Sequence, residues 1–198
     1  MIGRVRLRWA GPLAAVAIVA GAATGIAQLS DNFTNPAAPV PGHGMLTYLT
    51  MTGSHTGQFT GGVTQKGHEG TIAVLGLDTG VTVALGAGSG GAGSGRPVCD
   101  GVNFRKPTDR ATPLIFAAAA VGETIIGATF NEYHTTPSGQ DQLAFQIKLT
   151  NSHIASVHHV AATTTGAYDD IKLVPEAVKY TWKPTNTVTQ WNCNAAAP

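Results

Sequence analysis

Two stretches in which large apolar residues recur at every second position constrain the fold of this chain more than any other feature. Every second position of residues 142–150 is apolar: Leu143, Phe145, Ile147 and Leu149. The same holds in residues 177–183 for Val178, Tyr180 and Trp182. Because successive side chains of a β-strand point to opposite faces, this period predicts strands with one buried face. The chain is therefore expected to build a sheet around a one-sided core.

Other segments extend the same prediction. Runs rich in β-branched residues predict strands at 45–51, 69–85, 124–133 and 153–160, with breaks at Gly76 and Gly80. Asn151 and Ser152 mark a corner before the last of these runs, and residues 86–95 are a Gly/Ser/Ala repeat that predicts a flexible hairpin tip. About seven or eight strands indicate a mainly β fold, either a barrel or a sandwich.

One short helix is predicted inside this β-rich pattern. Thr112 is placed to cap it, Pro113 fits its first position, and Gly122 follows its last residue, Val121. Nearly all of its residues are apolar. We therefore expect the helix to be covered on most sides.

The first 27 residues have the pattern of a secretory signal peptide. Three arginines open the chain: Arg4, Arg6 and Arg8. An apolar stretch follows, and Gly25 and Ala27 are small residues at −3 and −1 of a cleavage site before Gln28. An uncleaved membrane anchor is the alternative, because the stretch nearly reaches the roughly 20 residues that span a bilayer.

The rest of the chain divides into three parts. Residues 28–43 are a Pro-rich linker and residues 44–184 form the folded domain. Residues 185–198 are a polar, Ala-rich tail, in which Trp191 and Cys193 are the residues that would hold it against the body.

The charge content of the chain excludes one class of partner. Charged residues make up only 12% of the chain and the net charge is +1. Without the three leader arginines, the chain has nine basic and 11 acidic residues, and no basic stripe alternates with aromatic residues. These features argue against nucleic-acid binding. Contact with a membrane is expected only through the N-terminal segment.

The two cysteines, Cys99 and Cys193, both lie beyond the leader. In an oxidising compartment such a pair is a disulfide candidate. Two buried free thiols are the alternative. The leader and the cysteines together predict an exported protein that is extracellular or associated with the cell envelope.

No pattern of catalytic or metal-binding residues emerges. His68 and Glu69 lack the second histidine four positions on that a zinc-binding helix requires, and the glycines around them disfavour a helix. On one strand, His158 would face away from His153 and His159. The pair Asp169–Asp170 is expected in a loop, without the separated carboxylates of a glycosidase. We therefore predict no catalytic residues, no metal and no cofactor, and a protein that is not an enzyme.

Four segments resemble one known family when taken in order. They are Lys66–Leu75, which contains Gly-His-Glu-Gly, then Lys106–Leu114, Phe145–Ile154 and Val178–Trp182. In order and spacing they are similar to the haemolysin-coregulated proteins (Hcp), the tube-forming proteins of type VI secretion. The resemblance spans about residues 44–184.

The resemblance implies a closed β-barrel with one helix on its side and a long loop, here roughly Gly80 to Arg105, that reaches neighbouring subunits. It implies hexameric rings that stack into a hollow tube, so the expected partner is the chain itself, with secreted effector cargo or other secretion components as further partners. The residues that match the family segments and are expected to serve assembly are Lys66, Gly67, His68, Glu69, Gly70, Lys106, Pro107, Asp109 and Pro113. Since the family usually lacks a leader, we expect an exported variant. A monomeric exported or envelope-anchored binding module is the alternative.

Overall fold

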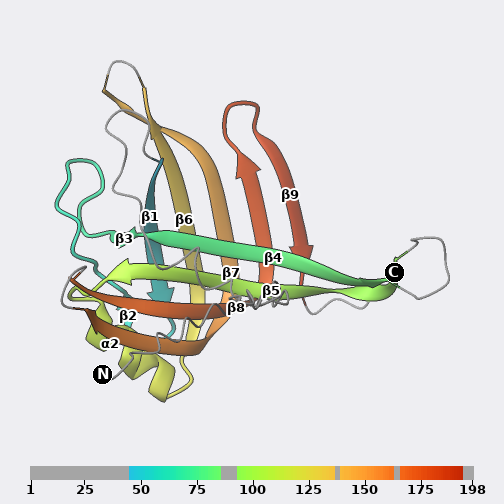
Figure 1. Ribbon diagram of the computed structural model, residues 1–198, viewed down its shortest axis with the longest axis horizontal. Coiled ribbons are helices and arrows are strands. Elements are labelled where there is room, and N and C mark those ends of the chain that lie inside the picture. Colours follow the sequence, from blue (N-terminus) through green and yellow to red (C-terminus); the bar gives the residue numbers. More distant parts are fainter. Residues whose placement is uncertain (1–44, 86–92, 137–138, 163–165, 194–198) are drawn as a thin grey trace, which may run out of the picture. The chain divides into compact units, whose positions relative to one another are not determined.

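The computed structural model of the protein describes residues 45–85, 93–136, 139–162 and 166–193 (Figure 1). All of them belong to one compact unit, Pro36–Pro198. The predicted leader at 1–27 and linker at 28–43 lie outside the described residues. Among the described residues, no helix is long and apolar enough to cross a membrane.

The described elements are nine strands and one short helix. The strands are β1 (Met45–Gly53), β2 (Gly57–Gln58), β3 (Ile72–Val74), β4 (Gly76–Leu85), β5 (Gly93–Pro107), β6 (Thr124–Thr135), β7 (Asp141–Ala162), β8 (Gly166–Trp182) and β9 (Thr187–Asn192). The helix is α2 (Thr112–Ala120). The mainly β fold predicted from the alternating segments is thus confirmed.

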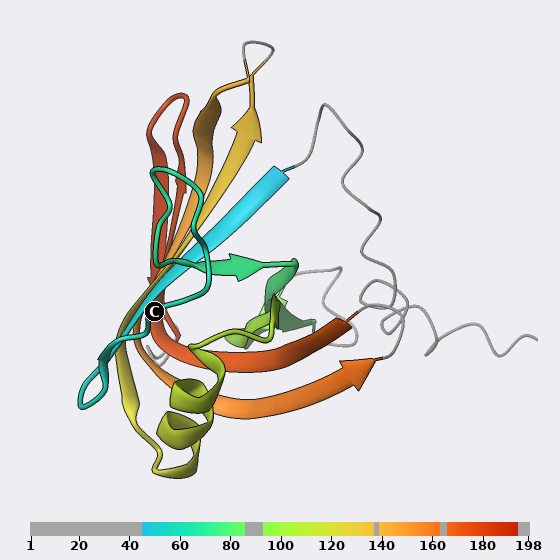
Figure 2. The ribbon, with the colours of Figure 1, turned by 90° about the vertical axis from the view of Figure 1, so that its left-hand side faces the viewer.

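All strands belong to one antiparallel sheet. Its order is β2-β1-β6-β7-β8-β5-β4, with β3 paired to β1 and β9 paired to β8. Figure 2 shows β1, β6, β7 and β9 as one curved layer, while β7 and β8 bend at its base toward β5. The long strand β8 therefore pairs with β5 through its first half and with β9 through its second half.

The core lies on the concave face of this layer. Two cross-strand rows supply much of it: Met51, Ala128, Leu149, Val178 and Trp191 in one row, and Leu49, Phe130, Ile147, Tyr180 and Thr189 in the next. Most of these side chains are buried, and Phe130 packs edge-on against Phe104 of β5. The alternation seen at 142–150 and 177–183 thus marks the buried face correctly.

The hydrogen-bonded order has two ends, so a closed barrel is not confirmed. The break in the hydrogen-bonded order falls within residues 72–85. In this stretch β3 pairs with β1, and β4 pairs with β5. Leu75 separates these two strands, and its backbone N–H donates to the carbonyl of Arg105 at 2.7 Å.

Three predicted features differ in the structure. The long extended loop at 80–105 consists largely of the paired strands β4 and β5, and the Gly-rich tip at 86–92 lies outside the described residues. Residues 187–192, assigned to the tail, form β9 of the sheet. Asn151 does not end a strand, because it takes a left-handed φ of 48° inside the continuous β7, which asparagine tolerates.

The helix also differs from its prediction. Its N-cap is Ala111, with no side-chain cap, and the hydroxyl of Thr112 points into a buried polar cluster instead. Pro113 lies in the first turn, and Gly122 follows the helix with a φ of 65°, both as expected. Only Ile115 and Ala118 are buried, so the helix is covered on one side only.

Candidate assembly site

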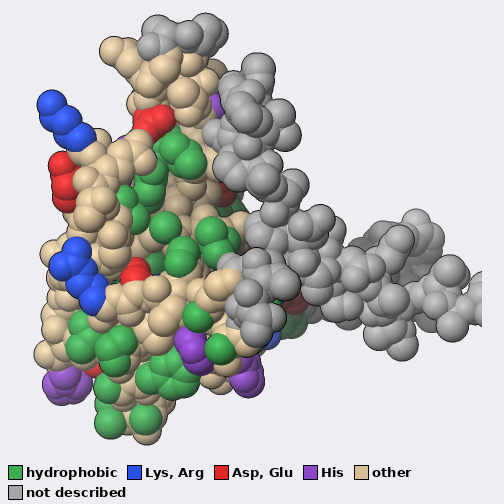
Figure 3. Space-filling model, turned by 60° about the vertical axis from the view of Figure 1, so that its left-hand side comes forward, with side chains coloured by type: hydrophobic (Ala, Val, Ile, Leu, Met, Phe, Trp, Pro, Cys, Tyr) green, Lys and Arg blue, Asp and Glu red, His purple; other side chains and the backbone are tan. Residues whose placement is uncertain are grey.

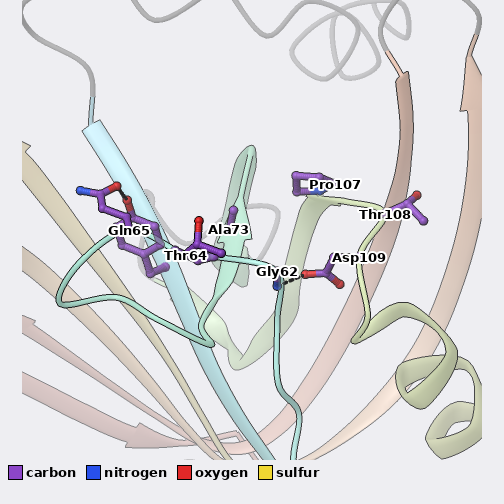
Figure 4. Close-up of a pocket in the computed structure, with 9 residues that line it drawn as sticks. Gly62, Thr64, Gln65, Ala73, Pro107, Thr108 and Asp109 are labelled. Atoms are coloured by element: carbon purple, nitrogen blue, oxygen red, sulfur yellow. Dashed lines mark hydrogen bonds between the residues drawn. The ribbon is translucent and has the colours of Figure 1, made fainter.

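Two of the family segments meet at one end of the sheet (Figure 4). The backbone N–H of Gly62 donates to the Asp109 carboxylate at 2.8 Å, and Arg110 Nε donates to the carbonyl of Gly61 at 2.6 Å. These bonds tie the loop that carries the Gly-His-Glu-Gly turn to the segment that leads into α2. The structure thus brings together residues that lie about forty positions or more apart in the chain.

Lys106 is the centre of the second segment. Its ammonium is fully buried and lies 2.9 Å from Asp169 Oδ2 and 2.8 Å from Asp109 Oδ1. It also donates to the Thr112 hydroxyl and to the carbonyl of Pro107, each at 2.8 Å. Because a buried charge is tolerated only when it is paired and hydrogen-bonded, this set of acceptors explains why a lysine can occupy a core position.

Asp169 completes this cluster from β8. Its second oxygen, Oδ1, lies 2.8 Å from Nδ1 of His159, whose side chain is partly exposed. Burial alone would raise the pKa of the Asp169 carboxyl, but hydrogen bonds from Thr112, His159 and Lys106 together lower it. The carboxylate is therefore held in its charged form next to Lys106.

The Gly-His-Glu-Gly turn is held by contacts to the outer face of β1 and β6. The His68 ring stacks on Tyr48 with ring centroids 4.2 Å apart and meets Tyr133 edge-on at 4.7 Å. His68 Nε2 lies 3.6 Å from Asp141, and Gln65 bridges Asp141 and the Tyr48 hydroxyl. Burial raises the pKa of both Tyr48 and Tyr133, so both rings stay neutral here.

The remaining motif residues of this turn act locally. Gly67 and Gly70 have φ angles of 87° and 73°, which side chains rarely adopt. The Glu69 carboxylate accepts the backbone N–H of Gly67 at 2.8 Å, and Lys66 is exposed. The turn is thus shaped by its glycines.

A hollow of about 470 Å³ lies between the two segments. Its walls come from Tyr48, Gly62, Val63, Thr64, Gln65, Ala73, Pro107, Thr108 and Asp109. In Figure 4, Gln65 and Thr64 lie on one side of this hollow and Pro107 and Thr108 on the other. The site therefore presents an open, mainly apolar concavity with a few polar groups at its rim.

Two further acidic residues fix the surroundings of the site. Glu123, just after α2, is buried and accepts the backbone N–H groups of His55 and Thr56 and the Thr56 hydroxyl, at 2.6–2.7 Å. The hydrogen bonds from Thr56 are the main cause of its lowered pKa. Asp170 accepts two hydrogen bonds from Arg105, which also covers the Tyr168 ring.

The predicted cysteine pair is joined in the structure. Cys99 of β5 and Cys193, directly after β9, form a disulfide with a Cα–Cα distance of 5.5 Å. Trp191 Nε1 donates to Cys99 Sγ at 3.2 Å. The C-terminal strand is therefore attached covalently to the β4–β5 hairpin, as expected from the sequence for Trp191 and Cys193.

Asp169, Thr112 and His159 were not predicted as members of the site, and Asp169–Asp170 lies in β8 rather than in a loop. The sequence holds one signal, which is an adjacent basic pair, Arg105–Lys106, and an adjacent acidic pair, Asp169–Asp170. The register places Arg105 opposite Asp170 and Lys106 opposite Asp169. Of the other histidines considered, His153 and His158 do not join this cluster. Within the described residues, no group of three or more His, Cys, Asp and Glu side chains is placed to hold a metal ion.

Comparisons with known proteins address the family directly. The family model described as "Type VI secretion system effector, Hcp" matches residues 48–189, which is well over half of the chain. The chain belongs to the Hcp family. No curated protein sequence matches it.

Solved Hcp structures share the fold at low identity. The Hcp1 protein of E. coli EAEC 042 is 22% identical with a TM-score of 0.70, and covers 76% of this chain and 99% of its own. A structure described only as an Hcp protein is 18% identical with a TM-score of 0.71, covering 77% and 100%. The secreted protein Hcp3 of Pseudomonas aeruginosa is 22% identical with a TM-score of 0.62, covering 74% and 98%.

The family match extends past the expected end of the domain at residue 184 and includes the first half of β9. The Hcp-like region of this chain thus reaches into the strand that precedes Cys193. Both segments of the candidate assembly site also lie inside the matched range.

Proposed function

We propose that this Hcp family member is a self-assembling structural subunit that forms rings and a hollow tube related to the inner tube of type VI secretion. The observation that carries the proposal is the uncovered apolar face of α2, next to the family segment 106–113. Leu114 is 38%, Phe116 37% and Val121 76% exposed, and the helix has no charged side chain. Figure 3 shows hydrophobic side chains at the lower end of the molecule, where α2 lies.

An apolar surface of this kind on a soluble protein is typical of a contact with another protein chain. The buried cluster around Lys106 supports the same role, because it anchors α2 to β5 and β8. A head-to-tail contact between copies gives a closed ring when the rotation between them closes. The proposed role is therefore structural and not catalytic.

The experiment is to produce the full chain with its leader in an exporting host and to measure its mass by light scattering after size exclusion, with negative-stain imaging. We expect particles near six times the monomer mass, or stacked rings. A monomer over a hundredfold range of concentration would contradict the proposal.

Export forms a second part of the proposal. The leader pattern and the Cys99–Cys193 disulfide support it, because disulfides persist in oxidising compartments. Cell fractionation together with mass spectrometry of the mature N-terminus tests it. A reduced protein in the cytoplasm that keeps Met1 would contradict export.

We also propose that the sheet closes into a barrel when copies assemble. Only Leu75 separates β3 from β4, so a small shift would join the two ladders. Hydrogen exchange of the amides at 72–79, slower in the assembly than in dissociated protein, would support closure.

A monomeric exported binding module is the second candidate function. The hollow of about 470 Å³ between the two family segments favours it, because its size is in the range of small-molecule sites. Absence of self-association in the mass measurement would leave this candidate as the better one.

A further inference from the structure

The row of residues next to the two core rows on the concave face contains polar, charged and aromatic side chains, unlike the mainly apolar core rows. One cross-strand row crosses β1, β6, β7, β8 and β9, and its members are Thr47, Glu132, Phe145, Trp182 and Thr187. Residues directly opposite each other across strands share a face and lie close together. Glu132 is therefore the neighbour of Phe145 on the same face as the core.

An aromatic groove of about 340 Å³ begins at Phe145, the cross-strand neighbour of Glu132. It is lined by Phe145, Tyr180, Trp182, Thr187, Thr189 and Trp191. The Tyr180 ring stacks on Trp191 with centroids 5.0 Å apart and lies 5.7 Å from Phe145, while Trp182 is 46% exposed. The Tyr180 hydroxyl is hydrogen-bonded to Thr79 of β4 at 2.6 Å, so the floor of the groove is fixed. The groove is thus preformed and open to solvent.

Glu132 is the charged residue of this cross-strand row and lies next to Phe145, which lines the groove. It is half-buried, and within the described residues no side chain forms an ion pair or hydrogen bond with its carboxylate. Burial raises its pKa. A carboxylate that loses water without gaining a partner destabilises the protein, and a bound cation would remove that cost.

We propose that Glu132 and the aromatic groove form a binding site for an arginine side chain on a partner polypeptide. A guanidinium is planar, stacks on aromatic faces and binds a carboxylate through two parallel hydrogen bonds. An apolar ligand would use the rings but leave the Glu132 carboxylate without a partner. The combination of rings and one carboxylate is therefore specific for an organic cation.

The groove is bounded by a strand with a free edge, which points to a polypeptide as the source of the cation. Among the described strands, β9 pairs only with β8, so the other edge of β9 presents backbone donors and acceptors to a visiting chain segment. This inference goes beyond the proposed tube function and does not depend on self-assembly.

Tryptophan fluorescence provides a direct measurement. Of the three tryptophans, Trp9 lies in the leader and the other two, Trp182 and Trp191, line the groove. The purified protein is titrated with an acetylated and amidated Ala-Arg-Ala-Arg-Ala peptide, with the same peptide carrying citrulline for arginine, and with free arginine amide. We expect the arginine peptide to bind at least about tenfold more tightly than either of the other two.

Two variants test the residues, with one matched control. Glu132→Gln and Trp182→Leu should each weaken binding of the arginine peptide by about tenfold. Asp78→Asn removes an exposed carboxylate on β4 that accepts a hydrogen bond from Asn103 and does not line the groove, so it should leave binding unchanged. Circular dichroism checks that each variant keeps the β fold.

Three results would overturn the inference. Equal binding of the citrulline peptide would show that charge is not recognised. Equal binding of free arginine amide would exclude a polypeptide as the ligand. Full binding by folded Glu132→Gln would remove Glu132 from the site. None of these results bears on ring formation, so the proposed function is tested separately.

Discussion

The ammonium of Lys106 and the carboxylate of Asp169 lie 2.9 Å apart and are both almost completely buried. They join β5 to β8 at the point where the chain turns into α2. Since Asp169 also accepts a hydrogen bond from Thr112, one ion pair connects two strands and the helix. The geometry of the candidate assembly site therefore depends on this pair.

Replacement of Lys106 by methionine should destabilise the fold strongly. It would leave the buried Asp169 carboxylate and the partly buried Asp109 carboxylate without their cation, which costs about 3–5 kcal/mol in free energy of unfolding. Urea unfolding followed by circular dichroism measures this loss. Lys66→Met, at an exposed lysine of the other family segment, is the control and should change the stability by less than about 0.5 kcal/mol. Equal stability of the two variants would show that the buried pair contributes nothing to the fold.

Acid should destabilise the protein through Asp169 and Glu123. Both have a folded-state pKa below the ordinary values of 3.8 and 4.5, so their stabilising effect is complete above those values and is lost as the pH falls through the lower, folded-state pKa. Glu132 acts in the opposite sense, because its pKa is raised by burial. We expect the urea midpoint to fall steeply below about pH 4.5.

Asp169→Asn separates this effect from general acid unfolding. The variant should be less stable at pH 7, but its stability should change less with pH in the acid range, because one carboxylate that must be protonated has been removed. Urea midpoints measured from pH 7 to pH 3 give both slopes. Parallel slopes for the variant and the natural protein would contradict the assignment.

Much of this fold could be predicted from local patterns, but the site could be predicted only in part. Alternation at 142–150 and 177–183 identified the buried faces of β7 and β8, because a strand repeats every two residues whatever its partners are. The cluster around Lys106 depends on register instead. Asp169 lies 63 positions from Lys106, and only pairing of β5 with β8 brings them together.

The remaining errors have local physical causes. β9 is short, and all but one of its residues are exposed, so its sequence carries no clear period-two signal. Asn151 does not end the strand, because asparagine accepts a left-handed conformation within a strand. For α2, its apolar sequence predicted burial on most sides, whereas the single chain covers only Ile115 and Ala118. The uncovered apolar side of α2 is the reason for proposing a contact with a partner chain.

Loss of the Cys99–Cys193 disulfide should destabilise the protein and release β9. The bond closes a loop with a sequence separation of 94, for which the chain-entropy model gives a stabilisation of up to about 4–5 kcal/mol. The double variant Cys99→Ser, Cys193→Ser should therefore unfold at lower urea concentration than the oxidised protein, and faster hydrogen exchange should appear first at 187–192. Dithiothreitol should lower the midpoint of the natural protein but not that of the double variant. An unchanged midpoint after complete reduction would contradict a stabilising role.

A single charge on the exposed face of α2 should weaken self-assembly without unfolding the subunit. Val121 is 76% exposed and Phe116 37% exposed, so aspartate at either position meets water in the monomer but would be buried in a contact between copies. We expect Val121→Asp and Phe116→Asp to raise the concentration needed for assembly by at least tenfold, a loss of about 1.4 kcal/mol per contact. Val174→Asp, at an exposed valine of β8, is the matched control for adding a charge at an apolar surface position. If the α2 variants assemble like the natural protein while the Val174 variant does not, the contact lies on the sheet and α2 is not part of it. The urea midpoints of all three variants should stay near that of the natural protein. A change in assembly could then be assigned to the contact surface and not to misfolding of the subunit.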